Sequence, residues 1–80
     1  MKTYSVIKDR SNSSEFLNKF EDLQTAKEFA ISELENTNPE NDDEGINIYT
    51  EAGMIMSLSK GQDITLIDPA TSMAIGTEKI

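Results

Sequence analysis

The sequence predicts an α+β domain in which one helix packs on one face of a small antiparallel sheet of four to six short strands. From Leu23 on, roughly 14 residues carry apolar side chains at helical intervals, whereas the segments on both sides alternate apolar and polar residues, as half-buried strands do. Short connections join the alternating segments and suit strands that pair with their neighbours. The expected order is ββ-α-βββ(β), and residues 1–80 are expected to form one domain.

The N-terminal part of the chain is expected to form a hairpin. Residues 3–9 alternate apolar and polar side chains, and polar turn residues follow them. Residues 15–20 suit a second strand, with Phe16 and Phe20 on one face. A helix that begins near Ser14 is the alternative, but a stronger start signal lies further along the chain.

That start signal is Asp22, whose carboxylate can accept hydrogen bonds from the first free N–H groups of a helix. Pro39 ends the helical segment because proline cannot continue the hydrogen-bond ladder and biases Asn38 away from helical geometry. The face expected to contact the sheet follows intervals of three, four and four and consists of Leu23, Ala26, Ala30 and Leu34, flanked by Phe29.

Three or four short strands are expected after the helix. In residues 45–51, Ile46 and Ile48 alternate with Asn47 and Tyr49, so that the isoleucines would face the helix and the tyrosine would face away. The inward-facing residues expected in the later strands are Met54, Met56 and Leu58, then Ile64 and Leu66, and finally Met73 and Ile75 in an edge strand.

The composition argues against catalysis. The chain contains neither cysteine nor histidine, so it lacks a thiolate, the commonest general base and the commonest zinc ligand. No enzymatic activity, catalytic residue or cofactor is therefore expected. No apolar stretch approaches the ~20 residues that span a bilayer, and the N-terminus has no signal-like apolar region. A cytoplasmic protein without a membrane partner is the expectation.

The negative charge of the chain is segregated. The formal net charge is −8, and no Lys or Arg lies between Glu28 and Ser59. Acids and bases balance in the remaining residues. Direct binding of nucleic acid is not expected, because phosphate contacts require clustered cations. A basic protein surface is the expected partner, although acidity also serves solubility alone. The eight acids of this window are Glu28, Glu33, Glu35, Glu40, Asp42, Asp43, Glu44 and Glu51.

Part of this acidic window is predicted to form a partner-binding surface with Tyr49. An exposed tyrosine provides contact area at low entropic cost, although packing of Tyr49 on the sheet is the alternative. The predicted partner-binding residues are Glu33, Glu35, Glu40, Asp42, Asp43, Glu44, Tyr49 and Glu51.

A calcium loop is the second interpretation of the acidic stretch. Residues 40–51, "ENDDEGINIYTE", place acids, a glycine and a final glutamate at EF-hand spacing. Glu40 stands where aspartate is preferred, and the strand-like alternation after Gly45 replaces the exiting helix that the motif requires. No metal ligand is therefore assigned, and a small divalent-metal-binding domain remains an alternative function.

The segments "YSVIKD", "EFLNKFEDLQTAKEFA" and "GINIYTEAGMIMSLSKG" resemble small inhibitor proteins of phages and mobile elements, among them anti-CRISPR proteins. The resemblance covers residues 4–61 as a hairpin, an "FxxLxxAKxxA" helix entry and a meander. It implies a non-catalytic inhibitor that binds a CRISPR effector or another nucleic-acid-binding complex in the host cytoplasm. The alternative is an assembly or regulatory protein that forms a homodimer through a sheet edge, for which residues 72–80 are the candidate.

Overall fold

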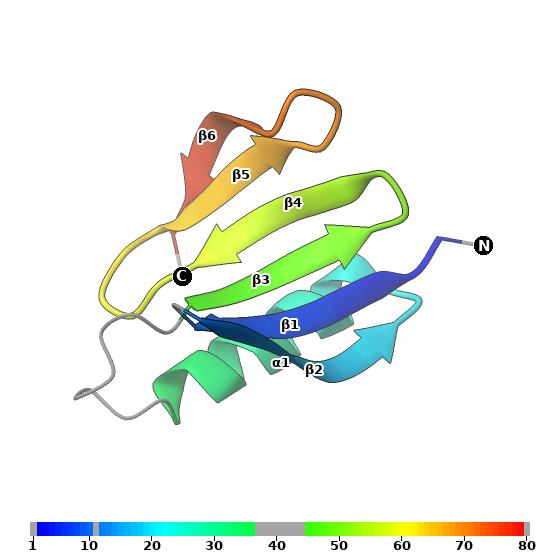
Figure 1. Ribbon diagram of the computed structural model, residues 1–80. Coiled ribbons are helices and arrows are strands. Elements are labelled where there is room, and N and C mark those ends of the chain that lie inside the picture. The colour runs from blue at the N-terminus through cyan, green and yellow to red at the C-terminus, as the bar shows by residue number, and fades with distance from the viewer. Residues whose placement is uncertain (1, 11, 37–44, 80) are drawn as a thin grey trace.

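The computed structural model describes residues 2–10, 12–36 and 45–79. Within these ranges the chain forms one six-stranded antiparallel sheet with one helix on one face, so the predicted α+β class is confirmed (Figure 1). The strand order across the sheet is β2-β1-β3-β4-β5-β6. The elements are β1 (Tyr4–Arg10), β2 (Ser13–Phe20), α1 (Leu23–Glu35), β3 (Gly45–Thr50), β4 (Gly53–Leu58), β5 (Ile64–Asp68) and β6 (Met73–Glu78).

Helix α1 begins where the sequence predicts. The Asp22 carboxylate accepts hydrogen bonds from the Thr25 backbone N–H and from the Thr25 hydroxyl, both at 2.9 Å. These bonds stabilise the charged carboxylate and lower the pKa of Asp22. The helix ends at Glu35, and the backbone N–H of Asn36 donates to the Ser32 carbonyl oxygen. Asp22 is thus the N-cap, as expected.

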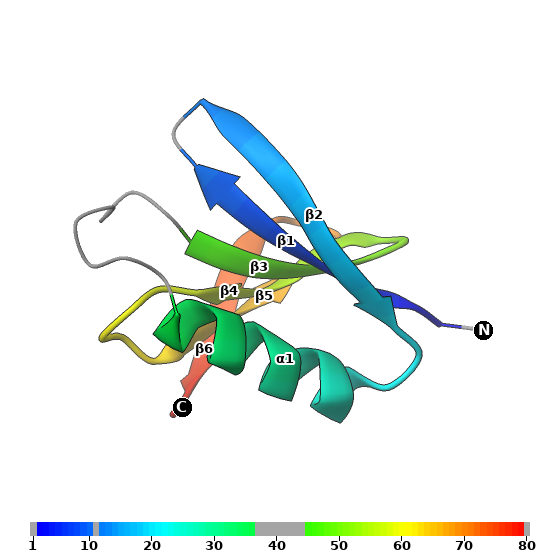
Figure 2. The same ribbon diagram turned by 90° about the horizontal axis from the view of Figure 1, so that it is seen from below.

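The core lies between α1 and the sheet, and Figure 2 shows the helix lying along one side of the strands. The small side chains of Ala26 and Ala30 are fully buried and let the helix backbone lie close to the strands. Lys27 and Glu78 add an ion pair between α1 and the end of β6. The buried apolar residues are Val6, Ala26, Ala30, Leu34, Ile46, Ile48, Met56, Leu58 and Ile64.

One prediction for the hairpin is wrong, because the register between β1 and β2 shifts at a bulge. Tyr4 pairs with Phe20, but beyond the bulge Ile7 pairs with Phe16, so the two phenylalanines lie on opposite faces. Phe20 contacts Phe29 of α1, with ring centroids 5.2 Å apart. Phe16 is 60% exposed on the face away from the helix.

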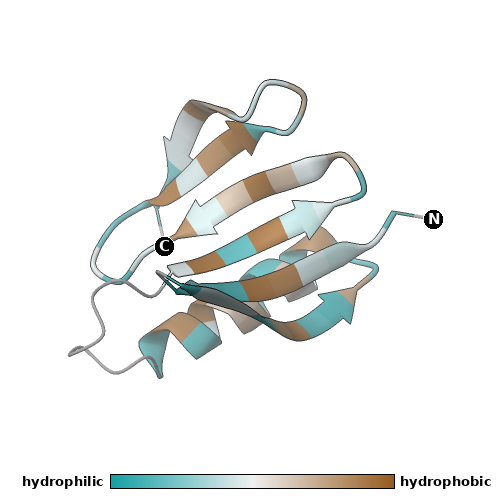
Figure 3. Ribbon diagram, in the orientation of Figure 1, coloured by the Kyte–Doolittle hydropathy of each residue, from teal (hydrophilic) through white to brown (hydrophobic). Residues whose placement is uncertain are grey.

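A second bulge changes which residues of β4 face the core. The register between β3 and β4 shifts so that Met54 pairs with Tyr49, and Ile55 rather than Met54 packs against the core. Met56 and Leu58 are buried as predicted. Figure 3 shows hydrophobic and hydrophilic residues following one another along these strands, but the bulges decide which face each one takes.

The predicted edge strand is confirmed as β6, but the prediction for its inward-facing residues is wrong. Met73 is 65% exposed and Ile75 is 69% exposed, although both were expected to point inward. The register between β5 and β6 shifts as well, and β6 forms an edge of the sheet (Figure 1). Helix α1 packs against β1 to β4, and the apolar residues that face it there are buried.

Candidate interaction surfaces

The predicted acidic surface is described only in part. Glu40, Asp42, Asp43 and Glu44 lie outside the described residues. On the last turns of α1, Glu33 is half-exposed and Glu35 is exposed. Glu51 is exposed in the turn between β3 and β4. The predicted calcium-loop segment continues into strand β3, which confirms the strand expected after Gly45.

Three acids of the predicted surface are described, and they lie at two ends of the molecule. The C-terminal end of α1 and the start of β3 lie at one end in both views (Figures 1 and 2). Strand β3 then runs the length of the sheet, so Glu51 lies at the far end, roughly 20 Å away by strand geometry. The fold therefore brings Glu33 and Glu35 together with the entry into β3, and it does not bring Glu51 to them.

Tyr49 lies on the sheet face away from α1, which is called the open face below. Paired residues of antiparallel strands share a face, so the register defines three successive rows across β2, β1 and β3. These rows are Lys19–Ser5–Tyr49, Phe16–Ile7–Asn47 and Ser14–Asp9–Gly45. The sequence predicted that Tyr49 faces away from the helix; its side chain lies on the open face and is half-buried.

Four side chains of the open face form one hydrogen-bonded group, the Asp9 cluster, which consists of Asp9, Ser14, Asn47 and Tyr49. The Ser14 hydroxyl donates to Asp9 Oδ1 at 2.6 Å. Asn47 Nδ2 and the Tyr49 hydroxyl both donate to Asp9 Oδ2, the latter at 3.2 Å. Burial, the negative charge of Asp9 and this hydrogen bond raise the pKa of Tyr49, so the phenol remains a donor at neutral pH.

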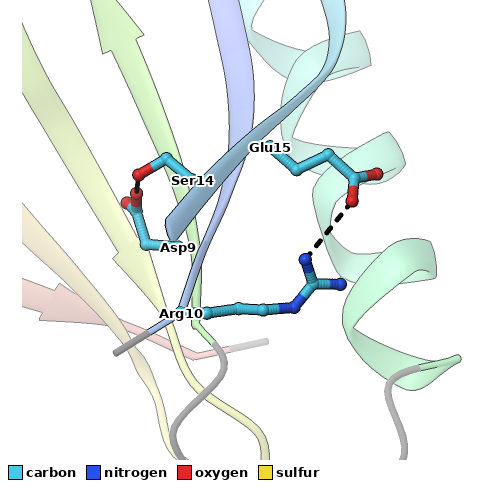
Figure 4. Close-up of polar contacts among 4 residues, drawn as sticks. All are labelled: Asp9, Arg10, Ser14 and Glu15. Atoms are coloured by element: carbon cyan, nitrogen blue, oxygen red, sulfur yellow. Dashed lines mark hydrogen bonds and ion pairs between the residues drawn. The ribbon is translucent and has the colours of Figure 1, made fainter. Parts of the chain in front are cut away.

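The Asp9 carboxylate has no ion-pair partner among the described residues. Its neighbour Arg10 contacts Glu15 at 3.4 Å, on the other side of the hairpin from Asp9 and Ser14 (Figure 4). Asn47 is only 7% exposed, and its Oδ1 atom accepts no hydrogen bond. The open face thus contains a carboxylate bound by three neutral donors and, beside it, an unsatisfied amide oxygen.

No sequence pattern marks Asp9 or Ser14 as a functional residue, and Asn47 is not among the predicted site residues. A signal for Asn47 was present, because asparagine is disfavoured inside strands and stands here between two isoleucines. Asp9 carried no comparable signal, since a charged residue near a strand end is ordinary. Only the pairing of β1 with β2 and β3 brings the four side chains together.

A cleft of about 390 Å³ lies at the C-terminal end of α1. Ile31 and Leu34 provide apolar lining, and the carboxylates of Glu35 and Asp63 and the ammonium groups of Lys60 and Lys79 also line it. The mixed charges do not select a ligand of one sign. Within the described ranges, no three Asp or Glu side chains gather as a metal site would require, and no helix is long and apolar enough to cross a bilayer.

No protein-family model, curated protein or solved structure gives a significant match to this chain.

Proposed function

We propose that this protein is a non-catalytic inhibitor that binds the basic surface of a nucleic-acid-handling protein through its acidic window, residues 28–59. The single observation that supports this function is the segregation of charge: eight acids and no Lys or Arg lie in the window. Carboxylates presented to Lys and Arg would compete with the phosphates of the partner's nucleic acid. In the manner of the phage inhibitors that the chain resembles, the target would be a CRISPR effector or another host nuclease complex in the cytoplasm.

Helix α1 offers support for this proposal. Glu28 and Glu35 are both exposed and, being seven residues apart, share one face of the helix. Acids near a helix C-terminus oppose the helix dipole, and α1 has no basic residue in its last turn to offset Glu35. An acid at an unfavourable position is consistent with a role in binding rather than in stability.

The experiment compares two charge-reversal variants. One carries Asp42→Lys, Asp43→Lys and Glu44→Lys. The matched control carries the same charge change outside the window, at Glu15, Glu21 and Asp63, all exposed. After the partner is captured from a lysate of the source organism and eluted with salt, its association rate with each variant is measured at low and high salt.

The proposal predicts that the window variant associates about tenfold or more slowly at low salt, because electrostatic steering is lost, while the control remains near wild type. The wild-type protein should also displace nucleic acid from the partner. If both variants associate equally slowly, the change in rate comes from net charge and not from the acidic window. Unchanged association of the window variant would refute the proposal.

A second function, self-association through the edge strand β6, is favoured by the exposure of Met73 and Ile75. An edge strand with apolar side chains is a template for pairing with a second copy. Sedimentation should then detect a concentration-dependent dimer that is insensitive to salt and is lost in Ile75→Lys. Phe16→Lys, at an exposed position on the opposite edge strand, is the matched control. A monomer at all concentrations excludes this function.

A further inference from the structure

The Asp9 cluster combines two features that a stable sheet face does not need. The half-buried Asp9 carboxylate is bound by neutral donors alone, with no described cation paired to it. Charges withdrawn from water are usually paired, because desolvation of an unpaired ion is costly. The Asp9 carboxylate on the open face therefore has no described cation beside it and can pair with a cation of another molecule.

The second feature is the unsatisfied Oδ1 atom of Asn47, which is withdrawn from solvent. A buried acceptor without a donor destabilises a fold by about 1–3 kcal/mol. Because Nδ2 and Oδ1 of an amide share one carbon, this acceptor lies beside the Nδ2 atom that donates to Asp9. Two acceptors of the open face, one of them charged, thus lie on the two sides of one amide group.

Two aromatic side chains lie on the same face as these acceptors. Phe16, 60% exposed, lies in the row of Asn47 with Ile7 between them. The row of Ile7 and Asn47 lies between the rows of Tyr49 and Asp9, so the Tyr49 side chain crosses this row to donate to Asp9. Its hydroxyl and Asn47 Nδ2 meet at the same Asp9 oxygen, and the hydroxyl's hydrogen bond of 3.2 Å is long for such a donor.

We propose that this part of the open face binds an arginine side chain of a partner protein. When the Tyr49 hydroxyl releases Asp9, the guanidinium donates to Asp9 and to Asn47 Oδ1, with the ring of Tyr49 beside its plane. Arginine fits better than lysine because its planar group has five N–H donors in a fixed fork, is weakly hydrated and stacks on aromatic rings. The site does not depend on the acids of the window, since its one charged group, Asp9, lies outside residues 28–59.

The test uses two capped tripeptides as probes, acetyl-Gly-Arg-Gly-amide and acetyl-Gly-Lys-Gly-amide, titrated into the whole protein and followed by backbone amide NMR. The arginine peptide should cause saturable shifts centred on Asp9, Asn47 and Tyr49. It should bind about fivefold more tightly than the lysine peptide, the factor expected for one exposed stacking contact.

Three variants define the site. Asp9→Asn should abolish the saturable shifts, whereas Glu51→Gln, which removes one exposed acid from the window, should leave them unchanged. Tyr49→Phe should bind the arginine peptide severalfold more tightly, because it keeps the ring and removes the hydroxyl that competes for Asp9. This last variant also tests the site if Asp9→Asn does not fold.

The proposal is overturned if both peptides shift the same residues across the acidic window and neither Asp9→Asn nor Tyr49→Phe changes their affinity. Weaker binding by Tyr49→Phe would also contradict it, since the hydroxyl would then be part of the site. Reversal of residues 42–44 tests the acidic window and leaves the Asp9 cluster in place. Failure of one proposal is therefore distinguishable from failure of the other.

Discussion

The two faces of the sheet bury their residues by different means, and β3 shows the contrast within three consecutive residues. Ile46 and Ile48 are 1% and 0% exposed because α1 covers them. Asn47 is 7% exposed on the open face, where its Nδ2 atom donates to Asp9 but its Oδ1 atom accepts no hydrogen bond. Burial of an apolar side chain under a helix stabilises the fold, whereas burial of an unsatisfied polar atom is costly. Equal burial therefore does not mean equal contribution to stability.

The largest expected effect tests the helix-covered face. Ile48→Ala should lower the free energy of unfolding by about 2–5 kcal/mol, because it leaves a cavity between α1 and the sheet. The exposed Phe16→Ala should change it by no more than about 0.5 kcal/mol, although the side chain removed is larger. Urea denaturation measures both variants. Comparable losses would mean that the open face is packed as firmly as the core.

Overpacking beneath the helix should have the next largest effect. Ala30 is fully buried, so Ala30→Leu should destabilise the protein by about 1–3 kcal/mol through displacement of α1 from the strands. Ser32→Leu, at an exposed position of the same helix, is the matched control and should have little effect on the midpoint of urea denaturation. If Ala30→Leu is tolerated as well as Ser32→Leu, the close approach of helix and sheet is not required.

A smaller effect is expected at the neighbouring buried residue of the open face. Asn47→Val removes the unsatisfied amide oxygen and replaces asparagine with a strand-favouring residue, so stability should change by less than about 1 kcal/mol or increase. Asn47→Asp is the control, since a second carboxylate beside Asp9 should be clearly destabilising at neutral pH. A loss for Asn47→Val as large as that for Ile48→Ala would show that the Asp9 cluster stabilises the sheet.

The smallest expected effect is a dependence on high pH. The pKa of Tyr49 is raised in the folded protein, so the proton is held more tightly there than in the unfolded chain. The resulting stabilisation is complete below the ordinary tyrosine pKa, about 10, and is lost as pH rises through the folded value. Phenolate absorbance, measured in a Tyr4→Phe background, reports Tyr49 alone.

In this background, Asp9→Asn should lower the Tyr49 pKa towards the ordinary value, because the carboxylate charge contributes to its rise. Ser57→Ala, at the position of β4 opposite Asn47, is a control that keeps the carboxylate. An unchanged Tyr49 pKa in Asp9→Asn would mean that Tyr49 does not donate to Asp9 in solution.

The sequence by itself determined the helix, its cap and the face that it buries. Asp22 begins α1, and Ala26, Ala30 and Leu34 are buried at the predicted spacing. These features depend on residues within four positions of one another, so local periodicity contains the information. The charge segregation is likewise a property of the sequence alone.

The tertiary structure decided the faces of Phe16 and Met54, because a bulge depends on how two strands pair and not on either strand alone. It also decided the exposure of Met73 and Ile75, which follows from the position of β6 at the edge, outside the strands that α1 covers.

The Asp9 cluster required the most tertiary information. Asp9 bonds Asn47 and Tyr49 across 38 and 40 residues of sequence, and no local pattern relates these positions. Only the insertion of β1 between β2 and β3 places the Asp9 carboxylate beside Asn47 and Tyr49 on the face away from α1. The sequence alone thus determined the elements and the charge, while pairing between distant strands decided which polar groups meet.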